Sequence, residues 1–177
     1  MSHLKISIGI FIALAASRFI PHPPNFTSLL ALSFYIPVLF GIKFLPFLVI
    51  SFILTDFIIG FHNVALFTWG SVILIGLMSK FFISNITNRV SGALLGACLF
   101  YFITNFGVWT LGSYGYTLEG LITCYTLAIP FFTYSLISTF VFSGLIEIIS
   151  KLNIIKFINL KKIYMDGART DSNRGTH

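Results

Sequence analysis

The sequence predicts an all-α membrane protein, a bundle of six transmembrane helices, and three observations lead to this fold class. Of the 177 residues, 56% are hydrophobic and only 9% are charged, whereas a soluble domain carries about 25% charged residues. The apolar residues gather in six runs along the chain. None of these runs alternates polar and apolar residues as the strands of a membrane barrel do. A bilayer is therefore the expected solvent of this chain.

The six apolar runs mark the predicted helices in order. A helix needs about 20 residues to cross the hydrocarbon core of a bilayer. The second run is the shortest and contains Pro37, so we expect that helix to be tilted, kinked or incompletely spanning. The sixth run is long, and Pro130 should kink it because proline removes a backbone hydrogen bond. The runs are residues 4–20, 29–41, 44–61, 64–83, 90–110 and 121–150.

The distribution of basic residues predicts the orientation of the bundle. Six spans place the N-terminus, the turn after residue 41, the loop 84–89 and the tail on one side, which holds ten of the eleven Lys and Arg residues. Only Arg18 belongs to the other side. The positive-inside rule then predicts a multi-pass protein of the inner (cell) membrane with both termini in the cytoplasm. Cleavage of residues 6–16 as part of a signal peptide would instead leave five spans and an external N-terminus.

The chain divides into a membrane domain, residues 1–150, and a basic cytoplasmic tail, residues 151–177, which we expect to be partly disordered. Residues 151–165 mix basic and apolar side chains, which favours a helix at the membrane interface. Residues 166–177 are polar, and we expect them to be disordered. Because the tail is not a basic folded face with interleaved aromatic residues, we exclude nucleic acid as a partner.

Polar and aromatic residues gather at the predicted outer ends of the helices. Arg18 and Asp56 have opposite charge and similar depth, so we expect them to form a pair. Such a pair either fixes the first helix against the third or contacts a ligand directly. Trp109 fits either a ligand-stacking residue or an aromatic residue of the membrane interface. The candidate ligand-binding residues are Arg18, His22, Asn25, Asp56, His62, Asn105, Trp109 and Tyr125.

No pattern in the sequence indicates catalysis or a metal centre. The chain lacks the common hydrolase, zinc-protease and phosphate-loop motifs, so we expect no enzyme activity and no cofactor. His22, His62 and Cys124 do not have the short spacing of zinc ligands, and we therefore predict no metal site.

Two stripes of small residues predict close helix packing. Gly9, Ala13 and Ser17 recur every four residues on the first helix, and Gly92 and Gly96 do so on the fifth. Such stripes let helices approach closely in lipid. We expect Gly92 and Gly96 to pack within the bundle, whereas the first stripe suits either the bundle or the helix of a partner protein.

Several motifs resemble a known group of proteins. The segments Arg18-Phe-Ile-Pro-His-Pro-Pro-Asn-Phe-Thr27 and Thr104-Asn-Phe-Gly-Val-Trp109, together with Thr55-Asp56, resemble a family of small bacterial membrane proteins to which no function is assigned. That family is similar to the substrate-binding S components of energy-coupling factor transporters. The resemblance covers about residues 9–145.

The resemblance implies a six-helix S component that binds a vitamin or another micronutrient at the extracytoplasmic face. Such a subunit docks on a coupling protein that carries two ATPase subunits, and Gly9, Ala13 and Ser17 would be the counterpart of the docking stripe. Two alternatives stay open. One is a non-transporting membrane scaffold of the same fold, and the other is a small proton-coupled carrier that uses Asp56. The polar outer cluster favours the first interpretation.

Overall fold

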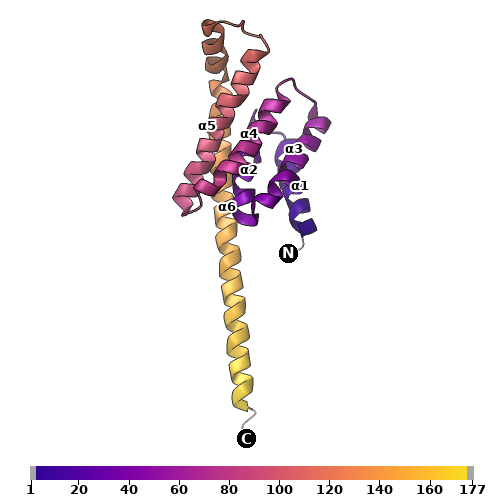
Figure 1. The fold of residues 1–177 in the computed structure, drawn as a ribbon. Coiled ribbons are helices and arrows are strands. Elements are labelled where there is room, and N and C mark those ends of the chain that lie inside the picture. Colours follow the sequence, from indigo (N-terminus) through magenta and orange to yellow (C-terminus); the bar gives the residue numbers. More distant parts are fainter. Residues whose placement is uncertain (1–2, 175–177) are drawn as a thin grey trace. The chain divides into compact units, whose positions relative to one another are not determined.

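The structure, a computed structural model, describes the backbone of residues 3–174 and the side chains of residues 3–152. Within residues 3–174 every regular element is helical, as the sequence predicts, and six α-helices occur together with two short 3-10 turns (Figure 1). The chain forms two compact units, residues 1–143 and residues 144–177. The elements are α1 (His3–Phe19), α2 (Leu29–Phe40), η1 (Ile42–Phe44), α3 (Leu45–Ile59), α4 (Ala65–Met78), η2 (Ser79–Phe81), α5 (Ile86–Thr110) and α6 (Leu118–Arg174).

Three helical segments of the described chain are long and apolar enough to cross a membrane. They are Ile42–Ile59, which joins η1 to α3, α5 over its whole length, and Leu118–Leu152 of α6. The helices Leu29–Phe40 and Ala65–Phe81 are apolar but shorter. The structure therefore gives the composition and helix lengths of a membrane protein.

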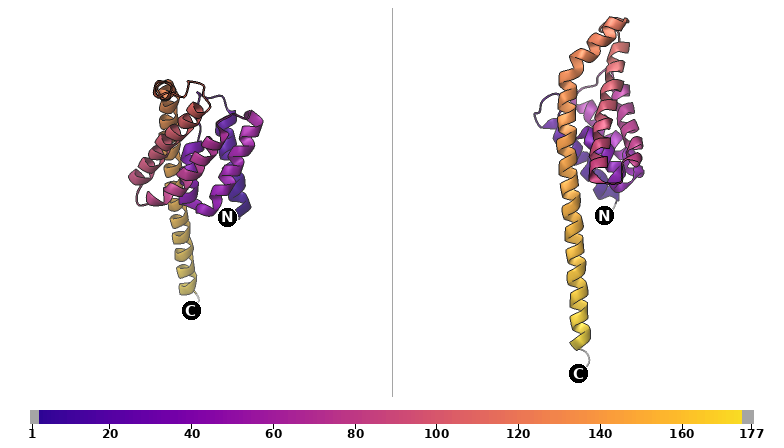
Figure 2. Two further views of the ribbon diagram at one scale, coloured as in Figure 1. Left: turned by 45° about the horizontal axis from the view of Figure 1, so that its top comes forward. Right: turned by 90° about the vertical axis from the view of Figure 1, so that its left-hand side faces the viewer.

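In the first unit, consecutive helices from α1 to α5 run in opposite directions (Figures 1 and 2). Helices α1 and α3 are parallel neighbours, because the His3 ring stacks on Phe44 at the beginning of α3 and Arg18 reaches Asp56 near its end. Helix α4 packs against both α2 and α5. This order brings the α1–α2 and α3–α4 loops to one end of the unit and η1 and η2 to the other.

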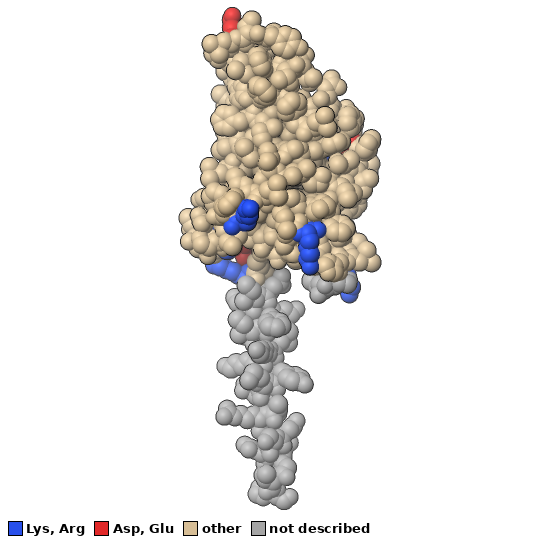
Figure 3. Space-filling view, in the orientation of Figure 1, with Lys and Arg blue, Asp and Glu red and all other residues tan. Residues whose placement is uncertain are grey.

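The core of the first unit combines large apolar side chains with buried Ser and Thr residues and Asp56, and its surface is largely apolar. Leu14, Phe34 and Leu48 have no exposed surface. Many large apolar side chains nevertheless point outward, and Leu66 is 76% exposed. Figure 3 shows that Lys and Arg are confined to one end of the visible face. A broad, uncharged apolar exterior of this kind is what a lipid environment requires.

The glycines of α5 pack inside the bundle, as predicted. A Cβ atom on Gly92 would lie 2.6 Å from Cβ of Phe82 and 2.7 Å from Cε2 of Phe34. A Cβ atom on Gly96 would lie 3.0 Å from Ile75 of α4. The absence of side chains at these two positions therefore allows α5 to approach α2, α4 and the chain after η2 closely.

Two helices begin earlier than the apolar runs predict, because polar residues cap them. Helix α5 begins at Ile86, and the Asn85 side chain accepts a hydrogen bond from the Asn88 backbone N–H at 2.8 Å. Helix α6 begins at Leu118, and the Thr117 hydroxyl accepts one from the Gly120 N–H at 3.0 Å. Capping residues of this kind extend a helix beyond its apolar face. Conversely, α4 ends at Met78 and η2 replaces its predicted last turn.

Helix α6 continues through the predicted tail. Pro130 lies inside α6, and within the first unit the beginning of this helix bends relative to the turns that follow it (Figure 2, right). The helix extends to Arg174 in the structure, and the predicted partial disorder of residues 151–177 stays a prediction. No proline follows Pro130 to interrupt the backbone hydrogen bonds. Residues 175–177 lie outside the described residues, and the interfacial position of residues 151–165 stays a prediction.

Candidate functional site

Arg18 forms the predicted pair with Asp56, and this pair joins α1 to α3. Nη2 of Arg18 donates to Oδ1 of Asp56 at 2.6 Å, and Nη1 donates to Oγ1 of Thr55 at 2.5 Å and to the Phe52 carbonyl at 3.3 Å. The guanidinium carbon also lies 4.6 Å from the centre of the Phe52 ring. The predicted pair is thus confirmed, with more contacts than a single ion pair.

Asp56 also connects α3 to α4. Its second oxygen, Oδ2, accepts a hydrogen bond from the indole Nε1 of Trp69 at 2.7 Å, and Nε2 of His62 lies 3.9 Å from the same oxygen. The Asp56 side chain is 1% exposed, whereas that of Arg18 is 13% exposed. Because both carboxylate oxygens have donors, the buried charge is compensated. We call Arg18, Thr55, Asp56 and Trp69 the polar clamp.

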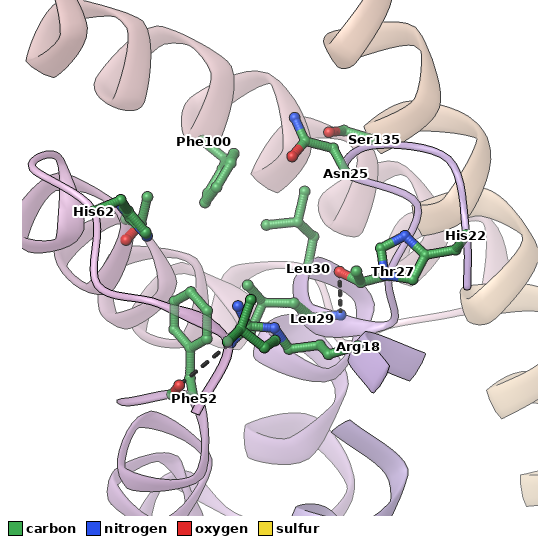
Figure 4. A pocket seen from close by; sticks show the side chains of 12 residues that line it. Arg18, His22, Asn25, Thr27, Leu29, Leu30, Phe52, His62, Phe100 and Ser135 are labelled. Atoms are coloured by element: carbon green, nitrogen blue, oxygen red, sulfur yellow. Dashed lines mark hydrogen bonds between the residues drawn. The ribbon is translucent and has the colours of Figure 1, made fainter. Parts of the chain in front are cut away.

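A cavity of about 240 Å³ lies beside the polar clamp (Figure 4). Arg18 and Phe52 line one side, and Asn25 and Ser135 lie across the cavity from them. Arg18 has five N–H donors, of which three are used by the contacts given above. The other lining residues are His22, Thr27, Leu29, Leu30, Ile59, His62, Thr68 and Phe100.

A second cavity, of about 260 Å³, adjoins the first and has a more aromatic wall. Tyr101 of α5 stacks on Phe132 of α6, with ring centres 4.4 Å apart. Asn105 also lines this cavity, and its Nδ2 donates to the Tyr101 carbonyl at 2.7 Å. The amide oxygen of Asn105 is not used in that bond and can act as an acceptor. The residues that line both cavities are Asn25, His62, Thr68, Phe100 and Ser135.

The loop between α1 and α2 positions two of these polar side chains. Asn25 has a φ of +62°, a left-handed conformation that asparagine tolerates better than most residues. The Asn25 carbonyl accepts a hydrogen bond from Ser138 of α6 at 3.5 Å, and Nδ1 of His22 lies 2.7 Å from the Pro23 carbonyl. The loop is therefore held against α6 beside both cavities.

One known protein family matches most of the chain. A profile described as a family of unknown function (DUF6580) matches residues 2–157. The chain belongs to this family. The matched range contains the polar clamp and every residue that lines the two cavities, so the candidate site lies entirely within the family region. No curated protein and no solved structure matches the chain.

The structure brings five of the eight candidate residues to the cavities. They are Arg18, His22, Asn25, His62 and Asn105. Asp56 lines neither cavity, and its carboxylate is bonded to Arg18 within the bundle. Its position favours the first role left open for the pair, the fixing of α1 against α3.

Trp109 and Tyr125 line neither of the two cavities, and their predicted role in ligand binding stays a prediction. The Trp109 ring packs against Phe106 and Tyr116, at centre distances of 5.6 and 6.3 Å. The Tyr125 hydroxyl donates to the Phe102 carbonyl at 2.7 Å. Both side chains are used in packing near the end of α5 and the beginning of α6.

Sequence reasoning missed several residues of the site. Trp69 is the most important of these, because its indole N–H is the second donor to Asp56. A tryptophan inside an apolar helix needs a partner for its N–H, and this need is the signal that could have identified it. The aromatic pair of Tyr101 and Phe132 had no comparable signal among 21 Phe and 7 Tyr residues.

Proposed function

We propose that this chain is the substrate-binding subunit, or S component, of an energy-coupling factor transporter, and that it takes up a vitamin or another micronutrient. The observation that carries this proposal is the pair of adjoining cavities, whose walls combine aromatic rings with amide, hydroxyl and guanidinium groups. Small-molecule sites have this composition, in which apolar walls hold a few polar groups that orient the ligand. A function in binding also agrees with the lack of catalytic motifs.

The proposal includes six membrane spans with both termini in the cytoplasm. Four basic residues lie at the end of the first unit opposite the α1–α2 and α3–α4 loops. They are Lys5 at the beginning of α1, Lys43 in η1, Lys80 in η2 and Arg89 at the beginning of α5. The positive-inside rule assigns that basic end to the cytoplasm. The cavities then belong to the extracytoplasmic half.

Retention of α1 is part of the same proposal. Ile10 and Leu14 of α1 are 3% and 0% exposed, and Arg18 at its end completes the polar clamp. Removal of this helix would uncover Asp56 and one wall of the first cavity. These contacts support a bundle of six helices over the five-span alternative.

The proposed partners are a membrane coupling protein and its ATPase subunits, with α1 as one contact. Gly9 and Ala13 are exposed on the first unit, and a Cβ atom on Gly9 would have no neighbour within 4 Å. Ser17 is partly used inside the bundle, because its hydroxyl lies 2.7 Å from that of Ser28. The exposed part of the stripe supports a partner contact at Gly9 and Ala13.

Identification of copurifying small molecules tests the proposed function. The protein is purified gently in detergent, and its extract is analysed by mass spectrometry beside extracts of two variants. Asn105→Ala removes a polar group from the second cavity, and we expect it to lower ligand affinity by ~1–3 kcal/mol. Asn88→Ala, on the same helix but at the basic end, is the matched control.

A small molecule that is enriched with the wild type and with Asn88→Ala, and depleted with Asn105→Ala, would support the proposal. No enriched molecule in any extract would instead favour the scaffold. The proton-coupled carrier has less support than either, because both oxygens of Asp56 already have donors within the bundle.

Cysteine labelling in whole cells tests the orientation. After replacement of Cys98 and Cys124 by alanine, a membrane-impermeant probe should label Tyr114→Cys in the α5–α6 loop. The same probe should leave Asn85→Cys, in the loop before α5, unlabelled. Labelling of Asn85→Cys from outside would reverse the proposed orientation.

A further inference from the structure

A third cavity, of about 430 Å³, lies at the end of the first unit opposite the candidate site. The end of α2 forms one side of it with Pro37 and Val38, and the end of α4 forms another with Leu77. Ile42 of η1 and Ile83 after η2 complete its apolar walls. We call this cavity the basic-end groove, because Lys80 also lines it.

The basic-end groove exists because two helices end early. Helix α2 has 12 residues and α4 has 14, which at 1.5 Å per residue gives them lengths of roughly 18 and 21 Å. The hydrocarbon core of a bilayer is about 30 Å thick. After each helix the chain turns through a 3-10 segment that packs on α2. Because α2 and α4 are short, the space beyond their ends is left open as the groove.

Two lysines lie at or directly beside the groove. Lys80 lines it, and Lys43 directly follows the lining residue Ile42. Among the side chains that the structure describes, neither lysine has an ion-pair partner. Their Nζ atoms lie 4.9 and 5.4 Å from the ring centres of neighbouring phenylalanines. Within residues 3–143 the acidic residues are Asp56 and Glu119, and neither belongs to this end.

We propose that the basic-end groove binds one anionic phospholipid of the bilayer, with an acyl chain against Val38 and Leu77 and the phosphate beside Lys80 and Lys43. Apolar walls beneath two unpaired ammonium groups match the two chemical parts of such a lipid. Lysines near a membrane surface attract anionic lipids, by about 1 kcal/mol for each residue. This site is distinct from the two cavities at the other end, and the proposal does not depend on the transported solute.

Native mass spectrometry of the full chain in detergent tests this proposal, with phosphatidylglycerol and phosphatidylcholine of equal chain length as probes. We expect the wild type to retain phosphatidylglycerol in preference to phosphatidylcholine. Lys80→Gln should lower the affinity for phosphatidylglycerol about fivefold, as expected from the loss of one basic residue, and leave phosphatidylcholine unchanged. Lys5→Gln, an exposed lysine at the same end but outside the groove, is the matched control and should change neither affinity.

A second variant tests where the acyl chain lies. Val38→Trp fills the groove from a half-buried position, and it should weaken binding of both lipids at least tenfold. Equal retention of the two lipids by the wild type, or equal effects of Lys80→Gln and Lys5→Gln, would overturn the headgroup assignment. Unchanged lipid binding by a folded Val38→Trp variant would overturn the groove itself.

Discussion

Replacement of Arg18 by alanine removes the cation that Asp56 faces in a site from which water is excluded. Asp56 is 1% exposed, and Oδ1 has Arg18 as its donor at 2.6 Å. In the Arg18→Ala variant Oδ1 loses its charged donor, and the carboxylate keeps the Trp69 indole on Oδ2, with Nε2 of His62 at 3.9 Å from the same oxygen. Breaking a buried pair in this way costs about 3–5 kcal/mol, because an uncompensated charge stays behind. We expect the loss of unfolding free energy to fall in that range.

The reverse replacement is expected to cost less. In Asp56→Ala the guanidinium keeps its contacts with Thr55 and the Phe52 carbonyl, and its 13% exposure at the cavity wall gives it some access to water. A cost near the lower limit, ~3 kcal/mol, follows. In the double variant neither charge is left unpaired, so the total loss should be ~2–3 kcal/mol smaller than the sum of the two single losses.

The assay is reversible unfolding in mixed micelles, followed by circular dichroism on the four proteins of the double-mutant cycle. Lys43→Ala is the control for loss of a cation from an exposed position, and it should change stability by less than ~0.5 kcal/mol. Single losses that add to the double loss within about 0.5 kcal/mol would show that the two side chains do not interact. That result would refute the polar clamp.

Two further predictions use matched pairs of residues. Gly92→Leu should lower the free energy of unfolding by ~1–3 kcal/mol, because its Cβ would lie 2.6 Å from a neighbouring side chain. Gly9→Leu has open space at Cβ and should leave the melting temperature unchanged. Equal melting temperatures of the two variants would contradict the packing of α5. Trp69→Phe should cost ~1.5–3 kcal/mol through loss of a hydrogen bond to a carboxylate. Trp109→Phe should be nearly neutral in the same unfolding assay, because its buried Nε1 has no partner among the described residues, and an equal cost for both variants would count against the assigned role of Trp69.

The helices and the ion pair between Arg18 and Asp56 could be predicted from the sequence alone. Apolar runs in a chain with 9% charged residues leave few alternatives to membrane helices. A lone arginine and a lone aspartate at matching depth in two such runs have no other economical partners. Depth along a helix follows directly from residue number, which is why the pair of Arg18 and Asp56 could be predicted without coordinates.

Which side chains reach the cavities could not be predicted in the same way, because contacts with neighbouring loops and helices decide it. Trp109 lies one turn beyond Asn105 and nearly on the same face of α5, yet only Asn105 lines a cavity. The reason is the distance along the helix, since Tyr116 from the following loop packs against the Trp109 ring. The Tyr125 hydroxyl is bonded to the α5 backbone, a contact that spacing alone does not reveal.

The polar clamp also bears on how the chain enters a membrane during synthesis. Asp56 follows Arg18 by 38 residues, so α1 is completed well before its counter-ion exists. An arginine within a span costs roughly 2.5–3.5 kcal/mol at the helix centre, and near a helix end its long side chain can instead extend toward the headgroups. Under the proposed six-span topology, nascent α1 is therefore expected to rest with Arg18 at the membrane surface and to reach its final depth only when α3 arrives. On this view the first three helices settle together, and α1 alone is a poor membrane anchor.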